Sequence, residues 1–189
     1  MTVAYADEVA QPLKGRCNAL GRLNRLTCGD FCAILRMSAE AAVSSLISKI
    51  GLVDNKGGHR SLEGKTTLLF YFSAHWCLPC RGFTPQLAQF YASHADSKSF
   101  EIIFVSGDNS EQEFLSYFKD MPWAAVAWGS MRSLKTSLEL AYGPVSGIPT
   151  LIAVDLATMR LMTRSARSFV ARSNPFVLLQ FLRPLVFDH

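Results

Sequence analysis

The chain has 189 residues, 49% of them hydrophobic, and a formal net charge of +4. This length and apolar content suit one domain with its own core, and no apolar run reaches the roughly 18 residues that a membrane-spanning helix needs. The excess positive charge lies at the two ends, and residues 37–155 carry no basic stripe with interleaved aromatic residues, so nucleic-acid binding is not favoured.

The first 36 residues allow two interpretations. Arginines spaced among leucines are typical of an organelle transit peptide, but Asp7, Glu8 and Asp30 argue against one. Alternatively, Met37 is the biological start. Under both interpretations we expect residues 1–36 to be a poorly ordered N-terminal extension. We expect a cytoplasmic protein, or a mitochondrial one if the extension is a transit peptide.

Residues 37–172 alternate between helix and strand patterns and are predicted to form the main domain. The predicted elements, in chain order, are a short helix near 38–50, a turn-rich connection at 52–61, a strand at 66–73, a helix at 78–94, a strand at 101–106, a helix at 110–120, a strand at 124–128, a helix at 131–141 and strands at 150–154 and 159–163. Alternating strands and helices followed by paired strands predict an α/β fold in which a central mixed β-sheet is flanked by helices.

The strand at 66–73 leads into the most informative motif of the chain. Its residues are apolar, β-branched and aromatic, as in a buried central strand, and apolar residues at helical spacing follow Cys80. The motif Trp76-Cys77-Leu78-Pro79-Cys80 therefore lies where a strand ends and a helix begins. This context favours a reversible redox pair over a structural site.

The helix start predicts different roles for the two cysteines. Unpaired N–H groups and the positive end of the helix dipole favour a thiolate over a thiol. Cys77, the more N-terminal cysteine, is expected to attack a partner disulfide, and Cys80 is expected to resolve the mixed disulfide. Arg81 adds positive charge nearby, while His75 is either a tuning residue or a solvated neighbour.

Zinc and an inert disulfide are the alternatives for this cysteine pair. A closed zinc site needs four ligands, and Cys17, Cys28 and Cys32 offer no second pair at matching spacing. We therefore expect no metal. We expect these three cysteines to be reduced thiols, with a regulatory disulfide as the alternative. A four-residue disulfide loop restricts the unfolded chain little, which argues against a purely structural bridge.

A second motif lies far along the chain. Ser146-Gly147-Ile148-Pro149-Thr150 precedes the apolar run 151–154. Pro149 can begin a strand there without having to donate a ladder hydrogen bond.

Together these segments resemble the tryparedoxin family, a relative of thioredoxin, and more loosely nucleoredoxin. The resemblance is closest over residues 72–87, and further matches follow in the same order at 118–123, 148–152 and 163–164. It covers about residues 45–170.

The resemblance implies a thioredoxin-like fold and a redox activity. Tryparedoxins take electrons from the dithiol trypanothione and pass them to peroxiredoxin-type and glutathione-peroxidase-like peroxidases and to other protein disulfides. By this resemblance Cys77 and Cys80 are the redox pair, Trp76 shields it, and no cofactor is bound besides their disulfide. We expect a monomer. A nucleoredoxin-like, redox-regulated protein-binding module is the alternative function.

The same resemblance assigns residues around the pair. Ile148-Pro149 is expected to be a cis peptide in a substrate-facing loop, although an ordinary trans proline is the base-rate expectation. Asp108 and Arg164 match family residues near the active site that are implicated in partner or substrate recognition. The alternatives are a strand-end turn residue for Asp108 and a solvated surface cation for Arg164.

Two positions depart from the family pattern, and a third differs from thioredoxin itself. Leu78-Pro79 replaces the usual Pro-Pro, which bears on redox potential and partner fit. Gly107-Asp108 replaces a Trp-Asp pair, so an aromatic wall of the site is expected to be missing. Tyr71 stands where thioredoxin has a buried aspartate, as in the tryparedoxin pattern, so proton transfer at Cys80 must use another group or water.

The C-terminal residues 173–189 contain an apolar run at 175–182, whereas the family has a polar tail. We expect this run to pack on the domain as a closing helix, because it is too short to span a membrane. Surface or membrane association through the run together with Arg172 and Arg183 is the alternative, but membrane contact is not our first expectation.

Overall fold

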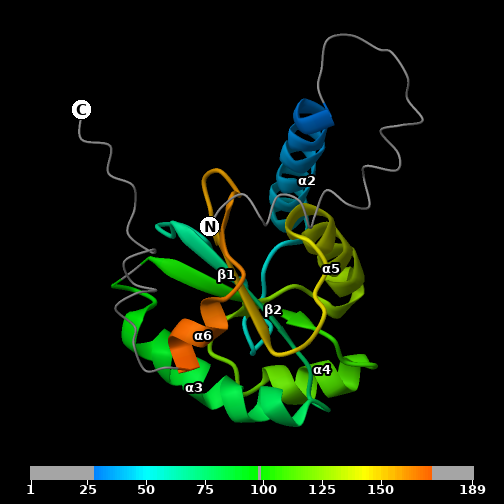
Figure 1. The fold of residues 1–189 in the computed structure, drawn as a ribbon. Coiled ribbons are helices and arrows are strands. Elements are labelled where there is room, and N and C mark those ends of the chain that lie inside the picture. The colour runs from blue at the N-terminus through cyan, green and yellow to red at the C-terminus, as the bar shows by residue number, and fades with distance from the viewer. Residues whose placement is uncertain (1–27, 98, 172–189) are drawn as a thin grey trace.

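The computed structural model describes residues 28–97 and 99–171 (Figure 1). The helices are α2 (Cys28–Ile50), α3 (Leu78–His94), α4 (Glu111–Phe118), α5 (Trp128–Tyr142) and α6 (Ala166–Ala171). The strands are β1 (Thr67–Ser73), β2 (Phe100–Ser106), β3 (Ala124–Ala125), β4 (Thr150–Asp155) and β5 (Leu161–Thr163). None of the described helices is long and apolar enough to cross a membrane. The predicted tail at 173–189 and most of the predicted extension lie outside the described residues.

A five-stranded mixed sheet forms the centre of the protein, in the order β3-β2-β1-β4-β5. β1 runs parallel to β2 and antiparallel to β4, β2 runs parallel to β3, and β4 runs antiparallel to β5. All seven residues of β1 are buried, which places this strand at the middle of the sheet. The predicted α/β fold with a central mixed sheet is confirmed.

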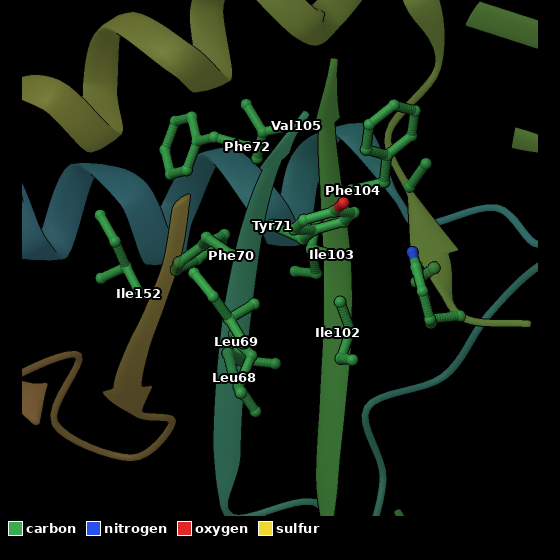
Figure 2. Packing of buried hydrophobic residues seen from close by; sticks show 14 of the residues in the cluster. Leu68, Leu69, Phe70, Tyr71, Phe72, Ile102, Ile103, Phe104, Val105 and Ile152 are labelled. Atoms are coloured by element: carbon green, nitrogen blue, oxygen red, sulfur yellow. The ribbon is translucent and has the colours of Figure 1, made fainter. Parts of the chain in front are cut away.

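Helices cover both faces of the sheet. α2 and α5 lie on one face, and α3, α4 and α6 lie on the other (Figure 1). Successive residues of β1 serve the two layers: Phe70 stacks on Tyr142 of α5, whereas Tyr71 contacts Phe83 of α3. Figure 2 shows Phe70 and Tyr71 on opposite sides of β1. The continuous apolar run of this strand therefore follows from burial on both faces.

The first described helix is longer than predicted. α2 begins at Cys28 rather than near residue 38, so it enters the range 1–36 that was expected to be an extension. Its sequence has no glycine or proline between Gly29 and Gly51 that would interrupt a helix. Gly51 then ends the helix with φ 74°, and its N–H bonds the carbonyl oxygen of Ile47 at 3.2 Å.

The bounds of the later elements differ less from the predicted bounds. β3 has only two residues instead of the predicted 124–128, because it pairs with β2 at only two positions. α5 begins at Trp128, which the prediction gave to that strand. The short helix α6 was not predicted, since six residues carry too little periodicity to identify a helix.

Three loops meet at one edge of the sheet. Phe72 near the end of β1 pairs with Val105 near the end of β2 and with Thr150 at the start of β4. The loops after β1 and β2 and the loop before β4 therefore lie together. This is the edge at which open α/β sheets bind their ligands, and both sequence motifs lie on it.

Candidate functional site

The two cysteines of the first motif lie where β1 ends and α3 begins. A disulfide joins them, with the Cα atoms 5.2 Å apart. Cys77 is the N-cap residue of α3, and its Sγ accepts a hydrogen bond from the backbone N–H of Cys80 at 3.2 Å. This N–H and the helix dipole both stabilise negative charge on the Cys77 sulfur once the disulfide opens. The arrangement is that of a redox disulfide in its oxidised state.

Exposure distinguishes the two sulfur-bearing residues. Cys77 is 5% exposed and Cys80 is fully buried. The residues that flank Cys77 are much more open, since Trp76 is 57% exposed and Leu78 is 71% exposed. An incoming sulfur therefore reaches Cys77 first, which agrees with the predicted roles of attacking and resolving cysteine.

The loop before β4 faces Cys77. The Ile148–Pro149 peptide bond is cis, as predicted, and the carbonyl oxygen of Ile148 lies 3.8 Å from Cys77 Sγ. The Ile148 side chain also packs on the small cluster formed by Ala74 and the two cysteines. A backbone segment therefore lies beside the sulfur that a substrate must approach.

Arg167 of α6 contacts the same loop, and the sequence prediction missed it. Its guanidinium donates to the carbonyl oxygen of Pro149 at 3.4 Å and lies over the ring of Phe83, 5.6 Å from the centroid. The arginine therefore joins α6 and α3 to the cis-proline loop. No local pattern signals this role, because Phe83 and Pro149 are far from Arg167 in the sequence.

Trp76 and Asp108 connect the loop after β1 to the loop after β2. The indole N–H of Trp76 donates to the carbonyl oxygen of Gly107 at 3.1 Å, and the backbone N–H of His75 donates to the Asp108 carboxylate at 2.6 Å. The other carboxylate oxygen accepts the Ser106 hydroxyl at 2.7 Å. Asp108 thus joins the loop after β2 to the loop that precedes the redox pair, and its role in recognition stays a prediction.

Arg164 lies at the far end of the cis-proline loop. Its guanidinium donates to the carbonyl oxygen of Gly143 at 3.5 Å and to that of Pro144. The half-buried side chain therefore anchors the first residues of this loop instead of being a freely solvated cation. Its predicted contact with a substrate stays a prediction.

Buried hydroxyl groups surround Cys80 from behind. The hydroxyls of Tyr71 and Thr84 share a hydrogen bond of 2.8 Å, and the Thr84 hydroxyl donates to the carbonyl oxygen of Cys80 at 2.9 Å. The Tyr117 hydroxyl bonds those of Thr84 and Ser73. Burial raises the pKa of Tyr71 above its ordinary value, so this phenol stays neutral. Neutral hydroxyls thus lie behind Cys80 and fix the first turn of α3.

Metal ligation has no support in the described part of the chain, which holds no group of three or more His, Cys, Asp or Glu side chains able to bind an ion. Cys17 and the side chains of Cys28 and Cys32 lie outside the described structure. The prediction that these cysteines are reduced thiols therefore remains open.

Known proteins are similar in sequence to the part of the chain that forms this site. A model of the thioredoxin-like family matches residues 64–161, which include both motifs. Tryparedoxin of Trypanosoma brucei brucei is 43% identical over 127 residues, which cover 67% of this chain and 83% of that protein. Nucleoredoxin of Homo sapiens is 47% identical over 96 residues, which cover 50% of this chain but only 21% of that protein.

Solved structures of tryparedoxins are also similar to this chain in fold. A structure of tryparedoxin II complexed with glutathionylspermidine superposes with a TM-score of 0.59 at 31% identity, over 76% of this chain and 99% of that one. The predicted resemblance is confirmed by the family match, the identity and the shared fold. The chain therefore belongs to the thioredoxin-like family, as a thioredoxin-fold oxidoreductase related to tryparedoxin and nucleoredoxin.

Proposed function

We propose that this protein takes electrons from trypanothione and passes them to peroxiredoxin-type and glutathione-peroxidase-like peroxidases and to other protein disulfides. The observation that carries the proposal is the Cys77–Cys80 disulfide at the start of α3, with Cys77 beside the cis-proline loop. The identity to tryparedoxin and the likeness to a tryparedoxin complexed with glutathionylspermidine support this choice of donor.

The reductive half of the cycle opens the disulfide. A thiolate of the donor attacks Cys77 Sγ, the Cys77–Cys80 bond breaks, and Cys80 leaves as a thiolate that takes up a proton. The second thiol of the same donor then attacks the mixed disulfide and releases Cys77 as a thiolate. Two electrons have moved, the donor has become a disulfide, and the N–H of Cys80 holds the new charge on Cys77.

The oxidative half reverses these steps on a protein. The Cys77 thiolate attacks the disulfide of an oxidised peroxidase and forms a mixed disulfide, which frees one partner thiolate. Cys80 then attacks Cys77 Sγ and releases the second partner thiolate, so the Cys77–Cys80 disulfide forms again. The exposed side chains of Trp76 and Leu78 offer apolar surface around the reactive sulfur for such a partner.

A coupled assay tests this proposal. The full chain is mixed with NADPH, trypanothione reductase, trypanothione, a tryparedoxin-dependent peroxidase and a hydroperoxide, and NADPH consumption is followed. We expect consumption that depends on the chain and disappears with Cys77→Ser. A rate no higher than that of Cys77→Ser would reject the proposal.

The intermediate can be trapped to test the roles of the cysteines. Cys80→Ser should hold a peroxidase on Cys77 as a mixed disulfide, which a non-reducing gel detects. Recovery of such a complex only from Cys77→Ser would reverse the assignment of attacking and resolving cysteine.

A redox-regulated binding module of nucleoredoxin type is the second candidate. It is favoured by the identity to nucleoredoxin and by the exposed Trp76 and Leu78 next to the switchable pair. Because the chain spans about a fifth of that protein, nothing of its partners is carried over. Binding of a partner that depends on the redox state, without turnover in the coupled assay, would favour this candidate.

The compartment and the oligomeric state also stay proposals. We propose a cytoplasmic monomer, with a mitochondrial location as the alternative. Microscopy of the full chain carrying a C-terminal tag tests the first point, and sedimentation velocity tests the second. Colocalisation with a mitochondrial marker or a dimer at micromolar concentration would contradict them.

A further inference from the structure

A groove of about 320 Å³ lies between α3 and α6, on the half of α3 that is away from the redox disulfide. The two helices pack on each other (Figure 1). A cavity of about 150 Å³ holds one benzene-sized ring, so this volume has room for about two large apolar side chains. The groove is lined by Gln86, Gln89, Phe90, Ser93 and His94 of α3 and by Phe169 and Val170 of α6.

The chemistry of the groove favours an apolar occupant. Phe90 and His94 stack with their ring centroids 4.9 Å apart. Two polar side chains already bond carbonyl oxygens of their own helix: the Ser93 hydroxyl donates to Gln89 at 2.9 Å, and the Gln86 amide also donates within α3. Among the described residues that line the groove, none is Asp, Glu, Lys or Arg. An uncharged apolar group therefore suits this surface better than a charged ligand.

The apolar run at 175–182 of the same chain is well placed to fill the groove. Every residue of this run except Gln180 is apolar, and none is charged. In the described structure α6 ends at Ala171, and Val170, one residue earlier, lines the groove. Pro175 follows Ala171 by four positions, so the run begins at most about 14 Å from the end of α6. The run therefore starts next to the groove.

An occupant of the groove would also support α6. This helix has six residues and is too short to be stable by itself. Arg167 of α6 nevertheless donates to the carbonyl oxygen of Pro149 in the cis-proline loop. A segment that packs between α6 and α3 would hold α6 against the domain and so keep Arg167 on that loop.

We propose that the groove between α3 and α6 is the docking site of residues 175–182 of the same chain, and that this docking holds α6 in place. The sequence predicts only that the run packs on the domain, and the groove supplies the place. Burial of the leucine and phenylalanine side chains of the run is favourable, because it removes a contiguous apolar surface from water.

Photo-cross-linking in the full chain tests where the run lies. Benzoylphenylalanine replaces Phe181, and the same probe in place of Phe187, which follows the run, is the matched control. After irradiation at low micromolar concentration, peptide mass spectrometry locates the cross-links. We expect cross-links within one chain from position 181 to residues 86–94 of α3, and none to these residues from position 187.

Two variants near the end of α3 test the groove itself. Ser93→Glu places a carboxylate in the groove, whereas Ala92→Glu places one on the exposed surface beside it. Both carboxylates oppose the helix dipole alike, so only docking separates the variants. We expect Ser93→Glu to raise the rate of chymotrypsin cleavage within the run about tenfold, and Ala92→Glu to leave this rate unchanged. The backbone amides of α6 should exchange with deuterium faster in Ser93→Glu by a similar factor, and not in Ala92→Glu.

Other patterns overturn the proposal. Cross-links between two chains would make the groove an interface between copies, and cross-links to Trp76 or Leu78 would place the run over the redox disulfide. Equal cleavage rates in the wild type and both variants would show that the groove does not hold the run. Protection of the run by anionic vesicles alone, equal in all three proteins, would assign it to a membrane surface. Unchanged deuterium exchange of α6 in Ser93→Glu, despite faster cleavage, would show that docking does not hold this helix.

Discussion

Buried polar side chains lie next to both ends of β2. Their hydrogen-bond partners are charged at one end of the strand and neutral at the other. At the start of the strand, Glu101 is 1% exposed, and its carboxylate accepts Arg60 at 3.1 Å and the Tyr91 hydroxyl at 2.8 Å. We call this the charged end. At the other end, which we call the redox end, the buried cluster behind Cys80 consists of hydroxyls, and Leu78 is left open to solvent.

This difference has a physical reason. A buried carboxylate must be paired, because the unpaired charge costs several kcal/mol, so the charged end is fully committed to its own partners. Opening the disulfide creates a new negative charge at the redox end, and a buried carboxylate directly behind Cys80 would oppose it. The carboxylate at this end, that of Asp108, lies in the loop after β2 and accepts hydrogen bonds from His75 and Ser106. Neutral hydroxyls hold the backbone of Cys80 without that conflict. The fold thus separates stability at one end of the strand from reactivity at the other.

Removing the attacking sulfur should show this separation most clearly. Cys77→Ser is expected to abolish disulfide reduction, because the sulfur that remains, that of Cys80, is fully buried and out of reach of a partner disulfide. The loss of the four-residue disulfide loop should lower the free energy of unfolding by at most about 2 kcal/mol relative to the oxidised wild type. Insulin reduction and urea unfolding measure the two quantities. Residual turnover in the variant would place the chemistry elsewhere.

The charged end should respond in the opposite way. Arg60→Ala leaves Glu101 buried without its cation, and we expect the free energy of unfolding to fall by about 2–3 kcal/mol. The rate of disulfide reduction by the folded protein should not change. Lys65→Ala is the control, since the partner of Lys65, Asp96, is fully exposed. If urea unfolding at neutral pH gives the same free energy of unfolding for Arg60→Ala and Lys65→Ala, the ion pair between Arg60 and Glu101 does not stabilise the fold as expected.

Alkaline pH should expose the role of the hydroxyl cluster. Burial raises the pKa of Tyr71 above the ordinary tyrosine value of 10.0, so the unfolded chain loses this proton first as the pH rises. The contribution of Tyr71 to stability is therefore fully present below pH 10 and is lost above it, by up to about 1.4 kcal/mol per pH unit. Tyr91 and Tyr142 are shifted in the same direction.

Tyr71→Phe tests this expectation at the redox end. The variant should be less stable at pH 7 by about 1 kcal/mol, because the hydrogen bond to Thr84 is lost. Its unfolding free energy should then fall less steeply than that of the wild type between pH 10 and 11. Parallel pH profiles of the two proteins, measured by urea unfolding, would contradict a buried, neutral Tyr71.

The sequence predicted the parts of this comparison that local patterns determine. An apolar run before a Cys-x-x-Cys places the pair between strand and helix. The second motif, around Pro149, predicted the loop that faces Cys77. Contacts made across the fold left no such pattern. Arg167 reaches Phe83 and Pro149 only because α6 packs on α3, and Tyr117 reaches Thr84 only because α4 and α3 cover the same face of the sheet. These residues could not be assigned before the sheet order was known.

The smallest expected effect concerns Leu78, the residue between the cysteines that departs from the family. Leu78 is the first residue of α3, where proline is well tolerated, and the extended backbone of Cys77 (φ −82°, ψ 106°) suits a residue before proline. Leu78→Pro should therefore raise the free energy of unfolding by about 0.5 kcal/mol. It also removes an exposed leucine next to Cys77, so the rate with a protein disulfide should fall more than the rate with dithiothreitol. Equal rate changes with both would mean that Leu78 acts on the redox pair itself and not on the surface that a partner meets.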